Sequence, residues 1–389
     1  MGLPRRIAII GIGMTKFGSL GAVTSRELFT EAAYRAMLDA GVTHKDIDAV
    51  FVGNLSSDVF EHQMHLAPIL PDYLALNNIP STRTEAACAS GGLSLRTAIM
   101  SVASGFYDVV IAGGVEKMTN LPTPKVTEAL AMCSDDLYEA NVGVTFPGVF
   151  AMMARAHMHK YGTTSEMLAA AAVKAHKNAL NNPLAQFHKE VTIDKVLNSP
   201  MIADPLHLYD CSPITDGAAA VIVTTLEKAK EFSGHPVEII ASAQASDTMA
   251  LHDRSELEGF RSTRIVAEKA YKMAGITPKD VDVVEVHDCF TIAEIMAIED
   301  LGFFPKGQGG HATLEGVTAI DGELPVNPSG GLKAKGHPVG ATGISQVVSI
   351  VEQLRGEAGK NQVADAEIGL TQNIGGSGGT QVVHVFKKI

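Results

Sequence analysis

The alternation of apolar and polar residues predicts short buried strands separated by amphipathic helices. Apolar runs typical of strands occur at residues 5–13, 108–114, 237–244 and 367–376. Apolar residues at helical spacing occur at residues 25–40 and 262–274, and in the segments with glycine-rich turns at 88–105 and 336–354. Alternation of strands and helices along a chain is typical of α/β proteins, in which helices cover a sheet.

Two segments of the chain repeat one another. Residues 40–52 read AGVTHKDIDAVFV and residues 274–286 read AGITPKDVDVVEV, with eight identical residues in thirteen and no gap. Each segment follows an amphipathic helix and predicts a glycine stop, an aspartate-containing turn and a buried strand. Chance similarity between two αβ units is the alternative, but the match over the whole turn favours duplication. Two βαβ-rich halves packed together predict a layered α/β protein.

The region between the two halves has a different composition. Residues 117–214 are richer in helix-forming residues, Met and His, and we interpret them as a mostly helical insertion in the first half. The segment SPITDGAAAVIVTTLEKA then returns to the first half as a strand. The predicted domains are therefore residues 1–116 together with 215–236, the insertion 117–214, and the second half 237–389.

Composition and charge narrow the classes of function. The formal net charge of −12 makes general nucleic-acid binding a poor hypothesis. The sequence shows neither a membrane-spanning run nor a signal peptide, so we expect a protein of the cytoplasm. The four cysteines are scattered and form no CxxC pair, which argues against a disulfide scaffold and against a zinc site. These observations favour an ordinary soluble globular protein.

The segment CASGG at residues 88–92 is a candidate site for a nucleophile. Small residues around Cys88 leave room for a ligand, and a helix is predicted to begin near Ala89. The positive end of a helix lowers the pKa of a nearby thiol and makes the thiolate more available. An inert buried cysteine is an equally good interpretation of this segment taken alone.

Three other segments carry candidate catalytic groups. His337 lies in the glycine-rich turn GHPVGATG and could take a thiol proton and return it, although it could also simply cap the turn. His287 follows a predicted buried strand in VEVHDCFT, and His, Asp and Cys together at a strand end are typical of the edge of an active site. The alternative is that His287 and Asp288 form only a local hydrogen-bonded pair. The segment TQNIGGSGG ends in glycines whose N–H groups could hold an oxyanion, or could form a plain hairpin turn.

Taken together and in this order, these segments resemble the thiolase superfamily over nearly the whole chain. The resemblance rests on the CxS segment at Cys88, the DGAAA strand, the HDCF segment, GHPVGATG and the terminal glycine loop. It implies an α/β thiolase fold, with duplicated βαβαβ halves in an α/β/α/β/α core and a mostly helical loop domain. The HDCF segment is most similar to that of archaeal and sterol-carrier-protein-type thiolases.

The resemblance also implies a role for each matched residue. Cys88 would become acylated, His337 would activate it, and His287 would complete an oxyanion hole through a water. A second oxyanion hole would use the N–H groups of Cys88 and Gly375, and Ser212 would meet the pantetheine arm of coenzyme A. Four basic residues of the insertion could hold the coenzyme A phosphates, or could form a solvated helix face: Arg155, Lys174, Lys177 and Lys189.

One position departs from the pattern of the best-known thiolases. Those enzymes carry a second cysteine in the terminal loop, where this chain has Asn373. Cys289, in the HDCF segment, is the expected substitute as the base that removes the α-proton of the second acyl group. A thiolase-like subunit that binds acyl-CoA or partners without turnover is the alternative suggested by the missing cysteine.

The function that the resemblance implies is acetyl-CoA C-acetyltransferase, which makes acetoacetyl-CoA for 3-hydroxy-3-methylglutaryl-CoA and mevalonate synthesis. A degradative 3-ketoacyl-CoA thiolase for longer chains is the alternative enzyme. We expect coenzyme A thioesters as substrates and no metal, nicotinamide or flavin. The expected partners are a second copy of the chain, in a homodimer or a dimer of dimers, and a complex with the synthase through a small bridging protein. Neither nucleic acid nor a membrane is an expected partner.

Overall fold

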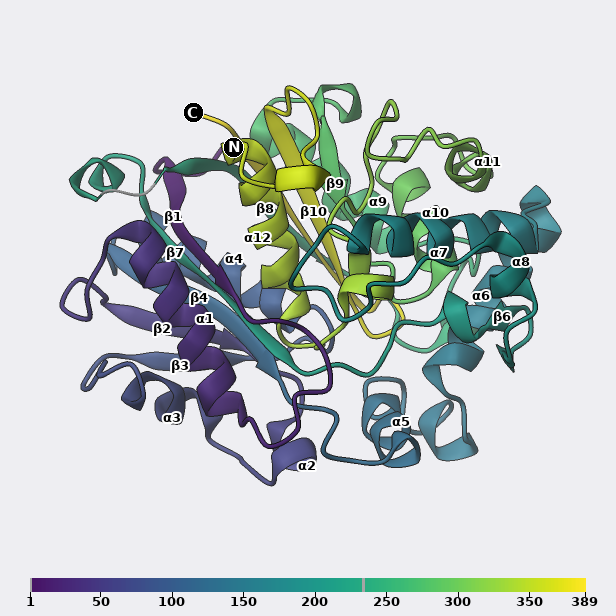
Figure 1. Cartoon of the computed structure of the whole chain (residues 1–389), viewed down its shortest axis with the longest axis horizontal. Helices are drawn as coiled ribbons and strands as arrows, with labels where there is room; N and C mark the ends of the chain where they lie inside the picture. Colours follow the sequence, from purple (N-terminus) through teal and green to yellow (C-terminus); the bar gives the residue numbers. More distant parts are fainter. Residues whose placement is uncertain (1, 233–234) are drawn as a thin grey trace.

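The protein contains one large mixed sheet, seen in a computed structural model that describes residues 2–232 and 235–389 (Figure 1). The strands of its first half are β1 (Ile7–Met14), β2 (Ala49–Gly53), β3 (Ser81–Thr84), β4 (Val109–Glu116) and β7 (Gly217–Thr225). The strands of its second half are β8 (Val237–Ser246), β9 (Val283–Glu285), β10 (Ile368–Gly375) and β11 (Thr380–Lys387). The strand order is β3-β2-β4-β7-β1-β8-β11-β10-β9, so the halves meet where β1 pairs antiparallel with β8.

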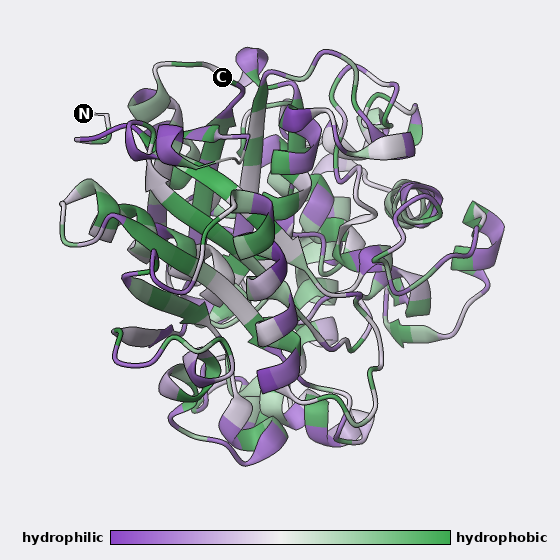
Figure 2. Ribbon diagram, turned by 60° about the vertical axis from the view of Figure 1, so that its left-hand side comes forward, coloured by the Kyte–Doolittle hydropathy of each residue, from purple (hydrophilic) through white to green (hydrophobic). Residues whose placement is uncertain are grey.

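Helices fill the space between the halves and cover their outer faces. The central helices α4 (Ser90–Ala103) and α12 (Thr342–Arg355) share one apolar core with strands of both halves. Helices α1 (Ser25–Ala40) and α3 (Leu66–Asp72) pack on the first half, and α9 (Arg261–Ala274) and α10 (Thr291–Asp300) pack on the second. This is the predicted α/β/α/β/α order, and Figure 2 shows the predominantly hydrophobic strands at its centre. The predicted fold class is confirmed.

The strand order repeats on the two sides of the β1–β8 contact. Moving outward, β7 and then β4 follow in the first half, and β11 and then β10 follow in the second, all paired antiparallel. The next strand, β2 or β9, is parallel to its neighbour in both halves. The repeated order is what a duplicated βαβ-rich unit predicts.

The repeated sequence also forms the same local contacts twice. Gly41 ends α1 and Gly275 ends α9 with positive φ values of 69° and 71°, a conformation that favours glycine. Asp48 accepts hydrogen bonds from two N–H groups at the start of β4, at 2.8 and 3.0 Å. Asp282 does the same at the start of β10, at 2.9 and 2.8 Å. These shared contacts explain why the glycines and aspartates recur at the same spacing.

The segment between β4 and β7 is mostly helical, as predicted. It contains α5 (Thr123–Ala131), α6 (Phe146–Tyr161), α7 (Ser165–Ala179), α8 (Ile193–Leu197) and the short strands β5 (Met201–Ala203) and β6 (Leu206–His207). Figure 1 shows these helices on one side of the sheet, with α6 and α7 next to α10 and α5 below them. Apolar side chains of α6 and α7 share a core with α10, which joins the segment to the second half. The domain boundaries at residues 117 and 214 stay a prediction.

The described chain also contains two short α-helices, α2 (Ser57–Glu61) and α11 (Gly309–Leu314), and several short 3-10 and π turns. Over residues 2–232 and 235–389, the helices are all too short or too polar to span a bilayer.

Candidate active site

Cys88 lies directly before the central helix α4. The helix begins at Ser90 with Ala89 as its N-cap residue, as the sequence predicted. The β2 strand approaches this turn so closely that a Cβ atom on Gly53 would lie 2.5 Å from the backbone of Ser90. Ala87 adopts a positive φ of 50°, and the resulting tight turn leaves the Cys88 side chain only 9% exposed.

His287 and His337 converge on Cys88 from distant parts of the chain. One ring nitrogen of each histidine and the Cys88 sulfur lie within 4.8 Å of one another. The two imidazole rings are nearly perpendicular, at 85°, with their centroids 5.0 Å apart. The Nδ1 atom of His337 lies 2.7 Å from Thr342 Oγ1, and the Nδ1 atom of His287 lies 3.1 Å from Asn373 Nδ2. Each ring is thus held through Nδ1, which leaves Nε2 for chemistry.

A largely apolar pocket reaches this cluster. Its polar lining includes Cys88, Cys289, His337 and Ser212. Its hydrophobic lining includes Met118, Val126, Leu130, Phe146, Phe150, Ile214, Phe290 and Val339. Ser212 donates its backbone N–H to the carbonyl oxygen of Cys289 at 2.9 Å, which joins the predicted coenzyme A segment to the HDCF segment. The pocket therefore offers an apolar surface for a carbon chain, with the thiols of Cys88, Cys211 and Cys289 and the imidazole of His337 beside it.

Burial keeps the side chains of the site neutral. It raises the pKa of Cys88 to about 12, although the hydrogen bond from the Gly376 N–H lowers this pKa. It also raises the pKa of Cys289 well above its usual value. Burial lowers the pKa of His337 to about 3 and that of His287 well below its usual value. The predicted lowering of the Cys88 pKa by the helix end is therefore wrong, because desolvation of the thiolate outweighs the helix dipole. A proton must move during the reaction for Cys88 to act as a nucleophile.

The glycine loop after β10 supplies a hydrogen-bond donor to Cys88. The N–H groups of Gly376 and of Cys88 itself both favour the thiolate form, and Gly376 also lines the pocket. Gly375 is the last residue of β10, where it pairs with Thr380. The role of Gly375 as a donor stays a prediction, and the structure adds Gly376 as the loop residue that reaches the sulfur. Two N–H groups beside a nucleophile are the arrangement that holds a tetrahedral oxyanion.

The chain matches family models over most of its length. Residues 7–227 match the model described as Thiolase, N-terminal domain, and residues 243–388 match Thiolase C-terminal domain-like. The chain belongs to the thiolase family. The family resemblance inferred from the segments around Cys88, Cys289 and His337 is confirmed, while the roles of individual residues stay predictions.

Similar proteins support the assignment of the chain to the thiolase family. It is 57% identical over 384 residues to the acetyl-CoA acetyltransferase of Methanothermobacter thermautotrophicus, with 99% of this chain and 100% of that protein covered. It is 49% identical over 392 residues to the acetyl-CoA acetyltransferase of Methanocaldococcus jannaschii, with 98% and 99% covered. A solved structure described as Ltp2-ChsH2(DUF35) aldolase superposes with a TM-score of 0.86 at 27% identity, with 98% of each chain covered. The chain is therefore an enzyme of the acyltransferase class, as predicted.

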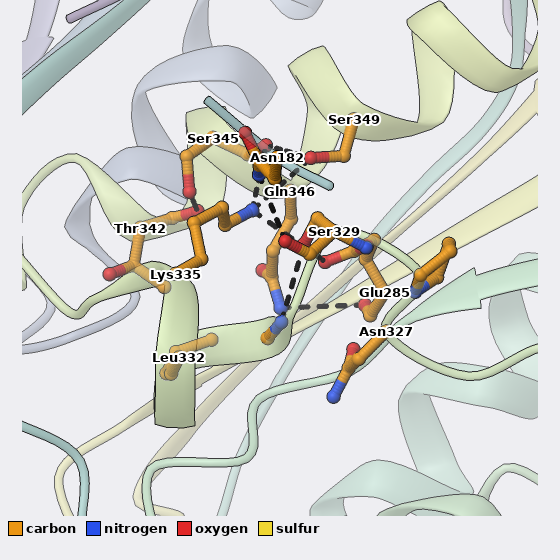
Figure 3. A network of polar contacts seen from close by, with 12 residues as sticks. Asn182, Glu285, Asn327, Ser329, Leu332, Lys335, Thr342, Ser345, Gln346 and Ser349 are labelled. Carbon is orange, nitrogen blue, oxygen red and sulfur yellow. Dashed lines mark hydrogen bonds and ion pairs between the residues drawn. The ribbon is translucent and has the colours of Figure 1, made fainter. Parts of the chain in front are cut away.

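A buried ion pair connects the two histidine segments of the thiolase site (Figure 3). Glu285 lies two residues before His287 and Lys335 lies two residues before His337. Both side chains are fully buried, and Lys335 Nζ lies 3.7 Å from Glu285 Oε2. Ser329 donates its N–H and its hydroxyl to the Glu285 carboxylate at 3.0 and 2.8 Å. The pair joins the chain segments that lead to the two histidines, although no pattern in the sequence indicated it.

Asp288 binds the segment that leads to His337 rather than the ring of His287, which the sequence offered as its partner in a local pair. Its Oδ1 atom accepts a hydrogen bond from the N–H of Leu332 at 2.7 Å, in the helical turn Gly331–Lys335. Burial raises the pKa of Asp288 to about 7. The ring of His287 is held by Asn373 instead, so Asp288 fixes the segment that leads to His337.

The basic residues predicted to hold phosphates lie in different environments. Lys174 is buried and donates to Glu294 Oε1 at 2.6 Å, so the prediction that it holds a phosphate is wrong. Arg155 forms a surface ion pair with Asp204. Lys177 and Lys189 are exposed, and their roles stay predictions.

Proposed function

We propose that this thiolase is an acetyl-CoA C-acetyltransferase that condenses two acetyl-CoA molecules into acetoacetyl-CoA. The observation that carries the proposal is a pocket in which Cys88, Cys289 and His337 meet. Two reactive thiols beside a histidine suit a reaction in which one thiol carries the acyl group and the other moves a proton. The names of the two archaeal relatives support acetyl-CoA as the substrate.

The first half-reaction acylates Cys88. Its sulfur attacks the carbonyl carbon of acetyl-CoA while the thiol proton passes to His337. The N–H groups of Cys88 and Gly376 hold the oxyanion until the bond from carbon to the coenzyme A sulfur breaks. The departing thiolate takes a proton from Cys289. Because the pKa of Cys88 is about 12, proton removal and attack are expected to be coupled rather than sequential.

The second half-reaction forms the carbon–carbon bond. The Cys289 thiolate removes an α-proton from a second acetyl-CoA, and the enolate oxygen is held by protonated His337 and by a water on His287. The enolate carbon attacks the acetyl carbonyl on Cys88, and the Cys88 sulfur leaves with the proton of His337. This step restores the neutral thiols and imidazoles of the resting site and releases acetoacetyl-CoA.

Coenzyme A is proposed to enter along Ser212. That residue lines the pocket next to Cys289 and belongs to the segment where thiolases contact the pantetheine arm. Lys177 and Lys189 are exposed on the inserted segment and are the remaining candidates among the four proposed phosphate ligands. The scheme uses coenzyme A thioesters as substrates and routes no step through a metal or redox cofactor.

In the cell, the proposed product supplies 3-hydroxy-3-methylglutaryl-CoA and mevalonate synthesis for isoprenoids, in the cytoplasm. A homodimer or a dimer of dimers is the proposed assembly, with the synthase and a small bridging protein as partners. The archaeal origin of the two acetyl-CoA acetyltransferases supports this setting. The solved structure described as Ltp2-ChsH2(DUF35) aldolase supports the bridging partner.

A comparison of acyl-chain lengths tests the proposed function. The enzyme is supplied with coenzyme A and 3-ketoacyl-CoA substrates of increasing length, and in the other direction with acetyl-CoA alone. We expect acetoacetyl-CoA to have the highest kcat/KM and acetyl-CoA to yield acetoacetyl-CoA. A preference for long chains would instead indicate a degradative thiolase. Binding of acyl-CoA without turnover in either direction would indicate a non-catalytic subunit.

A further inference from the structure

Asn373 lies on β10, at the centre of the polar contacts between Cys88 and His287. Its side chain is buried, with 1% of the residue exposed. Its Oδ1 atom accepts the N–H of Gly92 at 3.1 Å. Its Nδ2 atom donates to the carbonyl oxygen of Cys88 at 3.0 Å and contacts Nδ1 of His287 at 3.1 Å. One amide group thus joins the nucleophile turn, the helix α4 and the second histidine.

The two backbone contacts determine the orientation of the Asn373 amide. The N–H of Gly92 can only donate, so the atom that faces it must be the amide oxygen. The carbonyl of Cys88 can only accept, so the atom that faces it must be the amide NH₂. Turning the amide over would place a donor against a donor and an acceptor against an acceptor. The second hydrogen of the NH₂ group is therefore directed to Nδ1 of His287.

This contact determines which nitrogen of His287 carries the proton. A ring nitrogen that accepts a hydrogen bond has a free lone pair, so in neutral His287 the proton is on Nε2. Burial lowers the pKa of His287 well below its usual value, so the ring is neutral. The Nε2 atom is buried and has no hydrogen-bond partner among the described residues. It is a donor available for a reacting group beside Cys88.

We propose that Asn373 is a positioning residue that fixes His287 as the Nε2–H tautomer. The fixed tautomer has two consequences. It supplies the donor that holds the enolate oxygen through a water, a role that rests on the proposed function. It also prevents the cluster of Cys88, His287 and His337 from binding a metal, because a protonated nitrogen has no lone pair to offer. Without this constraint, three such donors within 4.8 Å of one another would suit a zinc ion.

The surroundings of Asn373 are built to hold the amide in place. A Cβ atom on Gly343 would lie 2.2 Å from Asn373 Oδ1, and one on Gly92 would lie 2.9 Å from it. Glycine at both positions lets α4 and α12 approach the amide closely. His384, on the neighbouring strand β11, lies with Nε2 3.1 Å from the carbonyl oxygen of Gly92 and so holds the same residue through its other backbone group.

The substitution Asn373→Asp tests the proposal by reversing the contact. A carboxylate at this position accepts the proton of Nδ1, so His287 changes to the tautomer with a free Nε2 lone pair. A carboxylate behind a histidine is also the arrangement that supports a zinc ligand. We expect Co²⁺ or Zn²⁺ to bind this variant at least about 100-fold more tightly than the wild type, with loss of the Cys88 thiol proton. A thiolate-to-cobalt absorption band reports the binding.

Two control variants separate this site from other effects. The double variant Cys88→Ser/Asn373→Asp should lack the cobalt band, because it has no thiolate. The variant Asn361→Asp makes the same exchange at a buried amide outside the site and should keep the metal affinity of the wild type. Equal affinity for Co²⁺ in the wild type and in Asn373→Asp would overturn the proposal.

The reaction itself provides a second readout. In Asn373→Ala and in Asn373→Asp, acetylation of Cys88 should slow less than carbon–carbon bond formation, although the amide also holds the carbonyl of Cys88. The kcat for carbon–carbon bond formation should fall by about 100-fold, as expected for the loss of an oxyanion donor, with little change in KM. Equal losses in both half-reactions would indicate a general structural role and would contradict the proposal.

Nitrogen NMR of the wild-type protein tests the tautomer directly and does not depend on any variant folding. The His287 signals, assigned with His287→Asn, should show a protonated Nε2 and an unprotonated Nδ1. A protonated Nδ1 would overturn the proposal. If the wild type fails to turn over acetyl-CoA, the proposed function falls, while the NMR and metal results still decide the role of Asn373.

Discussion

The buried pair of Lys335 and Glu285 allows the positioning of the two histidines to be tested by substitution. Replacing Lys335 with Met leaves the Glu285 carboxylate without its cation in a site where both side chains are fully buried. Removal of one partner from a buried pair costs about 3–5 kcal/mol, because the remaining charge stays desolvated. Replacing both partners with neutral residues, in Glu285→Gln/Lys335→Met, costs much less, within about 1 kcal/mol.

These free energies translate into measurable shifts in melting temperature. An unfolding entropy of about 2.1 cal/mol/K per residue over 389 residues gives about 0.8 kcal/mol/K. Loss of about 3–5 kcal/mol therefore lowers Tm by about 4–6 °C in each single variant. The double variant should lose only about 1 °C, so the two single losses are strongly non-additive.

The assay is thermal unfolding of the wild type, both single variants and the double variant, followed by circular dichroism. Activity is measured on the same samples, because the pair lies two residues before each histidine. We expect kcat to fall in both single variants and to recover in part in the double variant. Small single losses that add in the double variant would refute the idea that this pair holds the two histidine segments together.

Three further predictions concern individual residues. The pKa of Cys88 of about 12 predicts that its alkylation by iodoacetamide, in the substrate-free enzyme, rises about tenfold for each pH unit from 7 to 9; a plateau near pH 7 would show that the thiol is already ionised. Burial raises the pKa of Glu352 to about 7 from the usual 4.5, so the folded state binds more protons than the unfolded state between these values and stability falls as pH rises through this range. Glu352→Gln should therefore flatten the dependence of Tm on pH between about 4.5 and 7, and an unchanged slope would count against this carboxyl group. Gly343→Ala should lower kcat at least about tenfold and the free energy of unfolding by about 1–3 kcal/mol, because the new Cβ would lie 2.2 Å from Asn373 Oδ1. The control Gly148→Ala, whose new Cβ would have its nearest contact at 3.7 Å, should change neither quantity.

The fold could be predicted largely from local patterns in the sequence. The glycine and aspartate positions shared by residues 40–52 and 274–286 correspond to a repeated helix end and repeated hydrogen bonds, such as those of Asp48 and Asp282. Apolar runs marked the strands because the central sheet is buried on both faces. What the patterns did not predict is that the sheets of the two halves join through β1 and β8, because strand pairing at an edge depends on packing of the whole molecule.

The candidate site was predictable where short segments carry its chemistry and unpredictable where burial determines it. The four candidate catalytic side chains come together as expected, because each follows a strand or precedes a central helix. They are Cys88, His287, Cys289 and His337. The pKa of Cys88 was predicted with the wrong sign, because the sequence shows the helix end but not the depth of burial.

Polar contacts between residues far apart in the chain could not be predicted from the sequence either. Asn373 attracted notice only as the position of a missing cysteine, although it contacts both Cys88 and His287. Lys335 and Glu285 are 50 positions apart in the sequence numbering, and no local spacing relates them. Lys174 resembled an exposed phosphate ligand until its burial against Glu294 was known. Such partners are set by tertiary packing and leave no periodic signal.

In the proposed reaction, Cys88 carries the acyl group while Cys289 moves the proton. The most direct test is the intact mass of the wild type, Cys88→Ala and Cys289→Ala after exposure to acetyl-CoA, with acetoacetyl-CoA formation followed in the same samples. We expect turnover in the wild type, a stable acetyl group on Cys289→Ala without product, and no acetyl group on Cys88→Ala. An unmodified Cys289→Ala, or acetylation that persists in Cys88→Ala, would contradict it.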